Sequence, residues 1–460
     1  MSSDFVFNKE YPLSDLVEFV NEKIDSTKIS LDTYISTDNM ITDRGGVETA
    51  TKLPSATKFH HFKPTDTLFS NIRTYFRKVW FAEFEGGASP DVLVFRTKDP
   101  KVLEPAYLFY LLSDKKFSEY TVLTSKGAKM PRGDKAAMMQ YKVFVPEPNV
   151  QRAVSGALRT YDLKLKTNTK INQTLEHLAQ AIFKSWFVDF DPVKAKIETL
   201  ATGGSADDAE LAAMGVISAK TLDELNSLKA NNPEAFNKLA QTAALFPAAM
   251  QDSELGEIPE GWEVSEIGSE VTVVGGGTPS TKNTEFWEDG TIHWTTPKDM
   301  SGLSSKVLTR TDRKITELGL KKISSGLLSE NTVLMSSRAP VGYLALAKIP
   351  VAINQGYIAM KCEARLSPEY VLLWCDHNME EIKQRASGTT FAEISKSNFK
   401  PIPVIVPDSS VIDAFSAQVS RIYNLVHSNV LQSEILSSAR DFLLPELLSG
   451  DFSDFYKDGH

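Results

Sequence analysis

Several short patterns contain residue types that could bind a metal ion, but each lacks the partners that such a site requires. Asp189 and Asp191 are two nearby carboxylates without a third ligand, so a role near a helix end or in a linker is favoured. His60 and His61 have no further histidine or cysteine at zinc-site spacing, which favours an ordinary surface or core role. We therefore predict no bound metal ion.

A run of three glycines, residues 275–277, could begin a phosphate-binding loop. No Lys-Ser or Lys-Thr pair follows at the spacing of such a loop, so a turn is the better interpretation. The chain also has no Asn-Pro-Pro-aromatic or Asp-Pro-Pro-Tyr motif, which a methyltransferase acting on an exocyclic amine would need. These absences predict a chain without catalytic chemistry of its own.

The composition predicts a cytoplasmic globular protein. Of the 460 residues, 42% are hydrophobic and 24% are charged, and the length suggests roughly two to four domains. No apolar run is long enough to cross a bilayer, and residues 1–11 contain no hydrophobic segment of a signal peptide. Cys362 and Cys375, the only cysteines, are too few for a disulfide framework and fit a reducing compartment.

The net charge of −9 is concentrated in one segment. Residues 198–260 contain eleven acidic and three basic side chains, so the rest of the chain is nearly neutral. Outside that segment, basic residues form local clusters at 73–78, 126–135 and 298–322. Such clusters are either solvated surfaces or contacts for an anionic partner, and composition leaves both possibilities open.

The second half of the chain repeats the first at an offset of 261 residues. Gly127 matches Gly388, and Val-Phe-Val-Pro at 143–146 matches Val-Ile-Val-Pro at 404–407. Seven further positions between 154 and 182 match at the same offset. A chance match is hard to sustain over so many positions, so we predict two copies of one structural unit.

Each copy ends in a long helix with a coiled-coil seam. In the first helix, seam residues recur at alternating steps of four and three from Val154 to Trp186. Asn168 and Asn429 occupy equivalent seam positions, where a polar residue fixes register, although a partly exposed asparagine is the alternative. The predicted seam or subunit-interface residues are Leu165, Asn168, Ile182, Trp186, Phe187, Asn429, Leu443 and Leu447. The copies differ where Arg440 replaces Ala179.

The region before each helix is rich in short β-type runs punctuated by glycine and proline, and it has one helical stretch, which predicts an α+β domain. The predicted order is a globular domain at 1–148, a helix at 149–190, an acidic linker at 191–255, a second domain at 256–407, a second helix at 408–450 and a tail at 451–460.

Several strings in the second half carry a family pattern. They are Leu-Gly-Glu-Ile-Pro-Glu-Gly-Trp at 255–262, Gly-Gly-Thr-Pro-Ser-Thr at 276–281, Phe-Trp at 286–287, Ile-His-Trp at 292–294, Ser-Ser-Arg-Ala-Pro-Val-Gly at 336–342, Asn-Gln-Gly at 354–356 and Ile-Ser-Lys-Ser-Asn-Phe at 394–399. Together they resemble the target-recognition domain of type I restriction-modification specificity subunits. Residues 70–78, 181–190 and 444–450 extend the resemblance to nearly the whole chain. The first domain departs from the pattern because nothing near its start matches 258–262.

The resemblance implies the architecture and the partners. The fold would be two α+β target-recognition domains separated by two long antiparallel coiled-coil helices. Each domain would read one half of a bipartite target in double-stranded DNA. The helices would dock two copies of an adenine methyltransferase subunit, which uses S-adenosylmethionine, and a translocating nuclease subunit would join them.

On this interpretation the reading residues should be cations and amides. Arginine can bond guanine O6 and N7, and asparagine can bond adenine N6 and N7. The candidates are Asn71, Arg73, Tyr75, Arg77, Lys126, Lys129 and Arg132 in the first domain, and Lys282, Lys298, Ser336, Arg338 and Lys396 in the second. We expect about half of them to contact DNA. The alternatives are a self-sufficient DNA-modifying enzyme and a coiled-coil scaffold that binds no nucleic acid.

Overall fold

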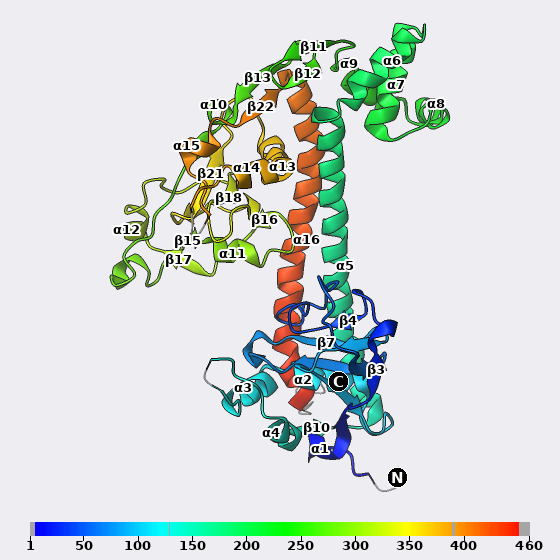
Figure 1. Cartoon of the computed structure of the whole chain (residues 1–460), viewed down its shortest axis with the longest axis vertical. Coiled ribbons are helices and arrows are strands. Elements are labelled where there is room, and N and C mark those ends of the chain that lie inside the picture. The colour runs from blue at the N-terminus through cyan, green and yellow to red at the C-terminus, as the bar shows by residue number, and fades with distance from the viewer. Residues whose placement is uncertain (1–4, 128, 389–391, 450–460) are drawn as a thin grey trace, which may run out of the picture. The chain divides into compact units, whose positions relative to one another are not determined.

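The computed structural model describes residues 5–127, 129–388 and 392–449, so the predicted tail at 451–460 lies outside the described residues (Figure 1). The chain divides into two compact units. One contains residues 1–165 and 434–460, and the other contains residues 166–433. Each unit includes one α+β domain, and the long helices α5 (Pro148–Phe187) and α16 (Ser409–Ser449) contribute residues to both.

The first domain consists of two four-stranded sheets and a short strand pair. One sheet has the antiparallel order β2-β9-β6-β7, and the other has the order β3-β5-β8-β4 with a parallel β4–β8 pair. The strands are β1 (Lys9–Pro12), β2 (Val17–Phe19), β3 (Lys23–Asp25), β4 (Tyr34–Ile35), β5 (Lys58–Phe62), β6 (Thr67–Ser70), β7 (Val79–Phe81), β8 (Gly86–Ala88), β9 (Val92–Thr97) and β10 (Lys142–Val145). The helices are α1 (Leu13–Leu16), η1 (Ser26–Lys28), η2 (Thr74–Phe76), α2 (Pro105–Ser113), α3 (Lys115–Leu123) and α4 (Lys135–Gln140).

The second domain is built on a five-stranded sheet of order β14-β21-β18-β19-β16, with a three-stranded sheet β17-β15-β20 and a β13-β22 pair. Its strands are β13 (Glu263–Glu266), β14 (Thr272–Val274), β15 (Ile292–Thr295), β16 (Val307–Leu308), β17 (Arg313–Ile315), β18 (Val333–Ser336), β19 (Leu344–Ala347), β20 (Ala352–Ile353), β21 (Tyr357–Lys361) and β22 (Pro403–Val406). Its helices are α10 (Ile267–Glu270), η3 (Thr284–Phe286), α11 (Pro297–Ser301), α12 (Glu317–Leu320), α13 (Pro368–His377), α14 (Met379–Gln384) and α15 (Lys396–Phe399).

Central strands of both domains contain an unbroken apolar run because both of their faces are buried there. In β9, Leu93 and Phe95 pack into the core that contains α2, whereas Val92 and Val94 pack into a separate core on the opposite face. Strand β21 alternates in the same way, with Ile358 and Met360 on one side and Ala359 on the other. Successive strand side chains point to opposite faces, so an unbroken apolar run is expected where a sheet is covered on both sides.

The seam pattern corresponds to the buried face of the long helices. Asn168, Asn172, Ala179 and Trp186 are all at most 2% exposed. In the second unit, Asn168 of α5 bonds Gln432 of α16, and Phe187 packs on Phe415 with ring centroids 4.9 Å apart. Residues later in α5 therefore contact residues earlier in α16, so the two helices are antiparallel in that unit.

Residues 191–255, predicted as an acidic linker, contain four helices with a core of their own, formed by residues such as Met214, Leu225 and Phe236. The elements are α6 (Asp191–Ala201), α7 (Ala206–Ser218), α8 (Leu222–Asn231), α9 (Pro233–Ala244), β11 (Met250–Ser253) and β12 (Gly256–Pro259). Much of the acidity lies in first turns, where capping boxes at Ser205 and Thr221 pair with Asp208 and Glu224. Acidic side chains there complement the positive end of the helix dipole.

Candidate nucleic-acid interface

A strained turn follows β6 in the first domain and presents two aromatic side chains to solvent. Arg73 and Arg77 flank the 3-10 turn η2 with positive φ angles of 49° and 51°, which are unfavourable for a residue with a side chain. Between them, Tyr75 is 50% exposed and Phe76 is 39% exposed, with their ring centroids 4.6 Å apart. Strain of this kind is often retained at binding sites, and exposed rings can stack on bases.

A basic hairpin lies beside this turn and is joined to it by main-chain hydrogen bonds. Lys126 and Arg132 exchange two hydrogen bonds of 2.9 and 3.0 Å, and the Arg73 N–H donates to Pro131 O at 2.9 Å. The side chain of Lys126 is 81% exposed and that of Arg132 is 59% exposed, and Lys129 is also exposed. The structure thus brings Arg73, Tyr75, Lys126, Lys129 and Arg132 to one neighbourhood.

Two cations of the hairpin, Lys126 and Arg132, are in ion pairs at the surface. Lys126 Nζ lies 2.5 Å from Asp134 Oδ2, and Arg132 Nη2 lies 2.9 Å from Asp91 Oδ1. The Lys126 ammonium, followed by the backbone N–H groups of Ala137 and Ala136, lowers the pKa of Asp134. Exposed pairs contribute little to stability, so these cations can exchange a carboxylate for a phosphate or a base edge at low cost.

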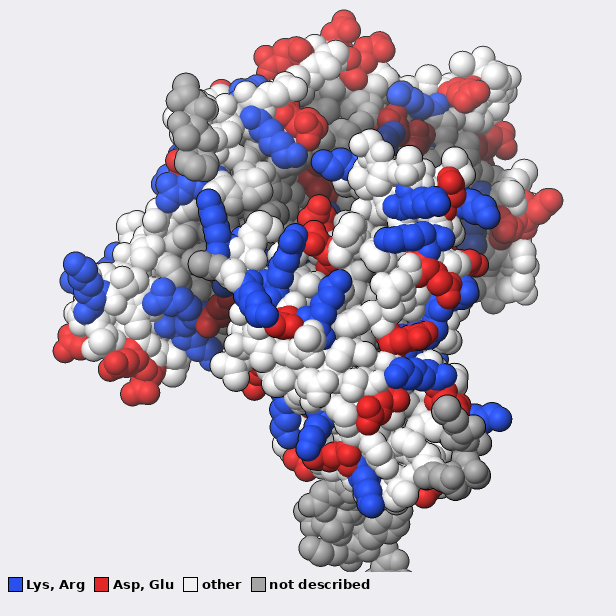
Figure 2. All heavy atoms as spheres, turned by 60° about the horizontal axis from the view of Figure 1, so that its bottom comes forward, with Lys and Arg blue, Asp and Glu red and all other residues white. Residues whose placement is uncertain are grey.

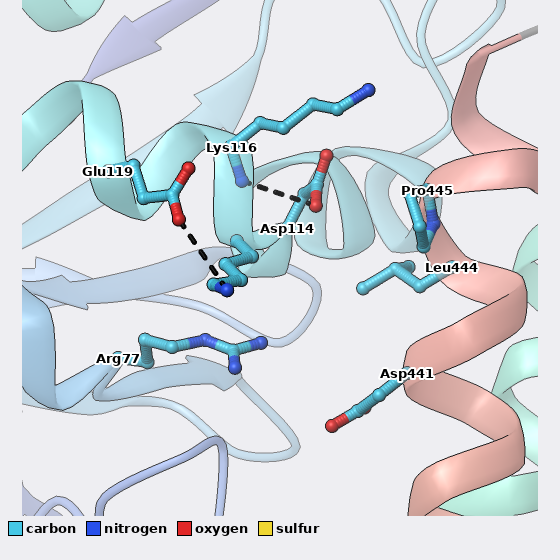
Figure 3. A pocket seen from close by; sticks show the side chains of 8 residues that line it. Arg77, Asp114, Lys116, Glu119, Asp441, Leu444 and Pro445 are labelled. Atoms are coloured by element: carbon cyan, nitrogen blue, oxygen red, sulfur yellow. Dashed lines mark hydrogen bonds and ion pairs between the residues drawn. The ribbon is translucent and has the colours of Figure 1, made fainter.

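Two other candidates of the first domain are turned away from solvent. Asn71 is 7% exposed, and its main chain rather than its side chain links the turn to Asp91 and Gly133. Arg77 extends towards α16 and lines a cleft of about 370 Å³ with Asp441, Leu444 and Pro445 (Figure 3). Its Nη2 also donates to Ser113 O at 3.1 Å. We assign Asn71 and Arg77 to holding the turn, not to base contact.

In the second domain, the loop after β18 occupies the position of the strained turn. Ser336 is fully buried and its hydroxyl donates to Pro340 O at 2.7 Å, so it shapes the loop and is not available to DNA. Arg338 is half-buried and its Nη1 lies 3.7 Å from Glu393 Oε2. The Ile394 N–H donates to Ser337 O at 3.0 Å, which joins this loop to the segment that precedes α15.

The remaining second-domain candidates are placed separately. Lys396 is exposed, and a Cβ built on Gly275 would lie 3.1 Å from its Nζ, so the glycine run leaves room for this cation. Lys298 is 84% exposed at its side chain and lies 3.4 Å from Asp312, and Lys282 is exposed before η3. Among the described residues, no hydrogen bond or ion pair is seen between Arg338 and either Lys282 or Lys298.

Two residues that were not among the candidates from the sequence have side chains that could take part in an interface. Glu393 forms an ion pair with Arg338. It lies 261 residues after Arg132, so the repeat offset applied to the candidate Arg132 would have identified it. Arg313 lies over the Trp287 ring at 3.6 Å, a cation–π contact that nothing in the local sequence spacing indicates.

Charged side chains of both signs are interspersed on the face of the molecule that Figure 2 shows. Figure 2 shows lysine and arginine side chains spread over the viewed face with acidic side chains between them, not one continuous basic surface. The distribution agrees with the ion pairs of Lys126, Arg132, Lys298 and Arg338, each of which has a carboxylate neighbour. It favours local phosphate and base contacts over binding through net charge.

The predicted seam residues differ in burial. Asn168, Trp186 and Phe187 are buried, whereas Leu165, Ile182, Asn429, Leu443 and Leu447 are half-buried. Asn168 Nδ2 reaches Gln432 Oε1 at 2.9 Å and Ser433 Oγ at 3.1 Å, and Asn429 donates to Asn172 Oδ1 at 2.9 Å. This polar layer gives the helix pair a preferred register in the second unit, because a shift would leave buried amides unpaired.

Neither a metal site nor a membrane span is present among the described residues. No group of three or more histidine, cysteine, aspartate or glutamate side chains there has the geometry of a metal site. No described helix combines the length and apolar composition of a transmembrane span.

The fold therefore defines a class of protein in which two copies of an α+β domain, each with a turn or loop after a central strand and an adjoining segment bonded to it, alternate with two long helices. A family model described as the type I restriction modification DNA specificity domain matches residues 8–177 and again residues 259–418. The chain belongs to this family of type I restriction-modification specificity subunits.

Relatives of the chain are similar over its whole length or over one half. The HindI specificity subunit of Haemophilus influenzae is 30% identical over 96% of this chain and 99% of its own. The MjaIX specificity subunit of Methanocaldococcus jannaschii is 33% identical over 45% of this chain and 47% of its own. The crystal structure of a type I system S subunit from M. genitalium has the same fold, with a TM-score of 0.53, 14% identity and coverage of 97% and 98%.

Proposed function

We propose that the chain reads a bipartite sequence in double-stranded DNA for a type I restriction-modification complex, one half-site per globular domain. The observation that carries this proposal is the two-fold match to the specificity family, with an exposed turn or loop and an adjoining segment built in the same way in each domain. Two independent reading units separated by helices suit a target with two specific halves and an unspecified gap.

We further propose that this subunit performs no catalysis and acts in the cytoplasm. The paired helices would dock two adenine methyltransferase subunits, which would bring S-adenosylmethionine, and a translocating nuclease subunit would complete the restriction complex. The same two helices also carry exposed apolar side chains outside the predicted interface residues, such as Leu178 at 49% and Ile435 at 69%. Exposed apolar groups along a helix favour a protein partner.

The test is a methyl-transfer assay on defined DNA with radiolabelled S-adenosylmethionine. The purified chain alone should incorporate no methyl groups, and addition of its cognate methyltransferase subunit should give methylation of one asymmetric bipartite sequence. Binding of the assembled complex should weaken steeply with salt, because phosphate contacts release counterions. Methyl transfer by the chain alone would favour the self-sufficient enzyme, and assembly without any DNA binding would favour the scaffold.

A further inference from the structure

The ends of the central strands are built identically in the two domains. Strand β6 ends at Ser70 and β18 ends at Ser336. In each domain the next residue donates its N–H across the sheet, from Asn71 to Asp91 O and from Ser337 to Gly356 O, both at 2.8 Å. The carbonyl of that same residue accepts an N–H, from Gly133 at 3.2 Å and from Ile394 at 3.0 Å.

The residues immediately before these donors are Arg132 and Glu393, and their main-chain bonding is also identical. Arg132 exchanges hydrogen bonds of 2.9 and 3.0 Å with Lys126, and Glu393 exchanges two bonds of 2.9 Å with Ser387. A glycine with positive φ follows the first partner in each case, at Gly127 and Gly388. Arg132 and Glu393 therefore occupy one structural position in two copies of the scaffold.

The side chains at this position are exposed and have opposite chemistry. Arg132 is 59% exposed and carries only donors, whereas Glu393 is 47% exposed and, when ionised, carries only acceptors. Their ion pairs, with Asp91 at 2.9 Å and with Arg338 at 3.7 Å, are solvent-exposed and therefore weak. In both domains, main-chain hydrogen bonds join the segment after the central strand to the segment that contains Arg132 or Glu393. The backbone arrangement therefore does not require the side chain of either residue.

We propose that this shared position determines base specificity in each half-site, with Arg132 selecting guanine and Glu393 selecting the exocyclic amino group of cytosine. Arginine donates to guanine O6 and N7, and a carboxylate accepts from cytosine N4. Opposite side chains on one scaffold position give two domains that share a docking geometry but read different bases. This inference rests on the proposed function and names the residues that carry its specificity.

The experiment uses the complete chain assembled with its methyltransferase partner and maps methylated sequences on unmethylated genomic DNA. Glu393→Ala should relax one base pair of the second half-site, with a loss of discrimination of roughly 5- to 100-fold, and leave the first half-site unchanged. Arg132→Ala should do the reverse. Glu393→Arg should shift the preferred base at that position towards guanine, which a purely structural role would not produce.

Matched surface variants serve as controls. Glu380→Ala in the second domain and Lys115→Ala in the first remove side chains that are 83% and 77% exposed in weak ion pairs, and both should leave the methylated sequence unchanged. Glu393→Gln provides an isosteric second variant if the alanine variant does not assemble, because its shape is retained and its acceptor is weakened.

Two results would overturn the inference. One is an unchanged methylated sequence in assembled Arg132 and Glu393 variants; the other is a uniform loss of methylation at all sites with the same base preferences. If the wild-type complex itself methylates no bipartite sequence, the proposed function fails. If it does and only the variants show no change, the proposed function stands and this inference alone is rejected.

Discussion

Arg440 of α16 donates from Nη1 to Asp162 Oδ1 of α5 at 2.6 Å. Arg440 is the second-copy residue that corresponds to the small apolar Ala179 of the first copy. Only 8% of the Arg440 side chain is exposed. Tyr110 of the first domain donates to the second oxygen of Asp162 at 2.6 Å, and Arg44 bonds Asp441, the next residue of α16. The arginine at this seam position is thus part of a group of polar contacts that connects the two helices to the first domain.

Removal of Arg440 should destabilise the first unit strongly. Arg440→Ala leaves Asp162 partly buried without its cation, and the expected loss is about 3 kcal/mol in the free energy of unfolding. Chemical denaturation of the chain in its complex would measure it. Arg421→Ala, which removes an exposed arginine of the same helix, should change stability by less than about 0.5 kcal/mol. Equal effects of the two variants would contradict a special role for the Arg440–Asp162 pair.

The buried carboxyl group of Glu176 in α5 should make the stability of the fold depend on pH. Burial raises the pKa of Glu176 above its ordinary value of 4.5, against the opposing effect of the Lys306 N–H, which donates to Oε1 at 2.5 Å. A carboxyl group with a raised folded-state pKa stabilises the fold at low pH, and that contribution is lost as pH rises through the folded pKa. Glu176→Gln keeps the acceptor oxygen without the buried charge.

The Glu176→Gln chain should therefore be at least as stable as the wild type at pH 8, and its stability should fall less between pH 4.5 and 8. Thermal unfolding across this range would measure the difference. Asp413→Asn, a change at an exposed carboxylate of α16, provides the control for a general charge effect. A steeper pH dependence in the Glu176→Gln chain than in the wild type would contradict the assignment.

Much of the fold could be predicted from the sequence because the apolar periods are strong. The alternating steps of the seam predicted the buried face from Val154 to Trp186, and the unbroken runs at 92–95 and 357–360 are strands covered on both faces. The capped helices of 191–255 were harder to predict, since short helices leave only weak periodicity.

The candidate site was less predictable because residue type does not report exposure. Asn71 and Ser336 have the right chemistry for base contact, but both sit at the covered end of a central strand. The partner of Arg440 could not be read from the sequence either, since Asp162 is 278 residues away and the pairing depends on the register of two helices. Only the repeat offset connected distant positions, as it does for Arg132 and Glu393.

Exchange of the second domain should change one half-site only. The structure refines the segment to exchange, because a replacement of 256–400 would separate β13 from its partner β22. A replacement of 250–407 by the same region of a relative keeps this strand pair and the β11–β12 pair intact. The hybrid complex should methylate a target with one old and one new half, as mapped by sequencing. Loss of both halves in a folded, assembled hybrid would contradict independent reading.

Arg338→Ala should weaken binding to the second half-site by roughly 1–3 kcal/mol, the usual value of a bidentate base contact. The side chain is 38% exposed and close to Glu393, so its loss also frees that carboxylate. Titration of the assembled complex with DNA that carries either the intact or a scrambled second half-site would measure the effect. Unchanged affinity for both DNAs would remove Arg338 from the interface.

We expect helix length to set the gap between the half-sites, because the family resemblance implies that a pair of antiparallel helices separates the two domains. Adding one heptad to each helix keeps the seam pattern, because the repeat is seven residues. Seven residues lengthen a helix by about 10 Å, which corresponds to about three base pairs at 3.4 Å each. Rotation of the added turns makes three an upper value for the increase in the gap.

The structure shows where to insert these heptads. Insertion between Leu165 and Lys166 and between Ser433 and Glu434 falls at the division between the two units, so Asp162 keeps Arg440 and Asn168 keeps Gln432. A heptad in α5 alone would allow only one of these two pairs to form in register and should impair assembly, which provides the control. Methylation mapping of the doubly extended complex should show both original half-sites across a longer gap. A stable, active complex with an unchanged gap would reject the idea that the helices measure the distance.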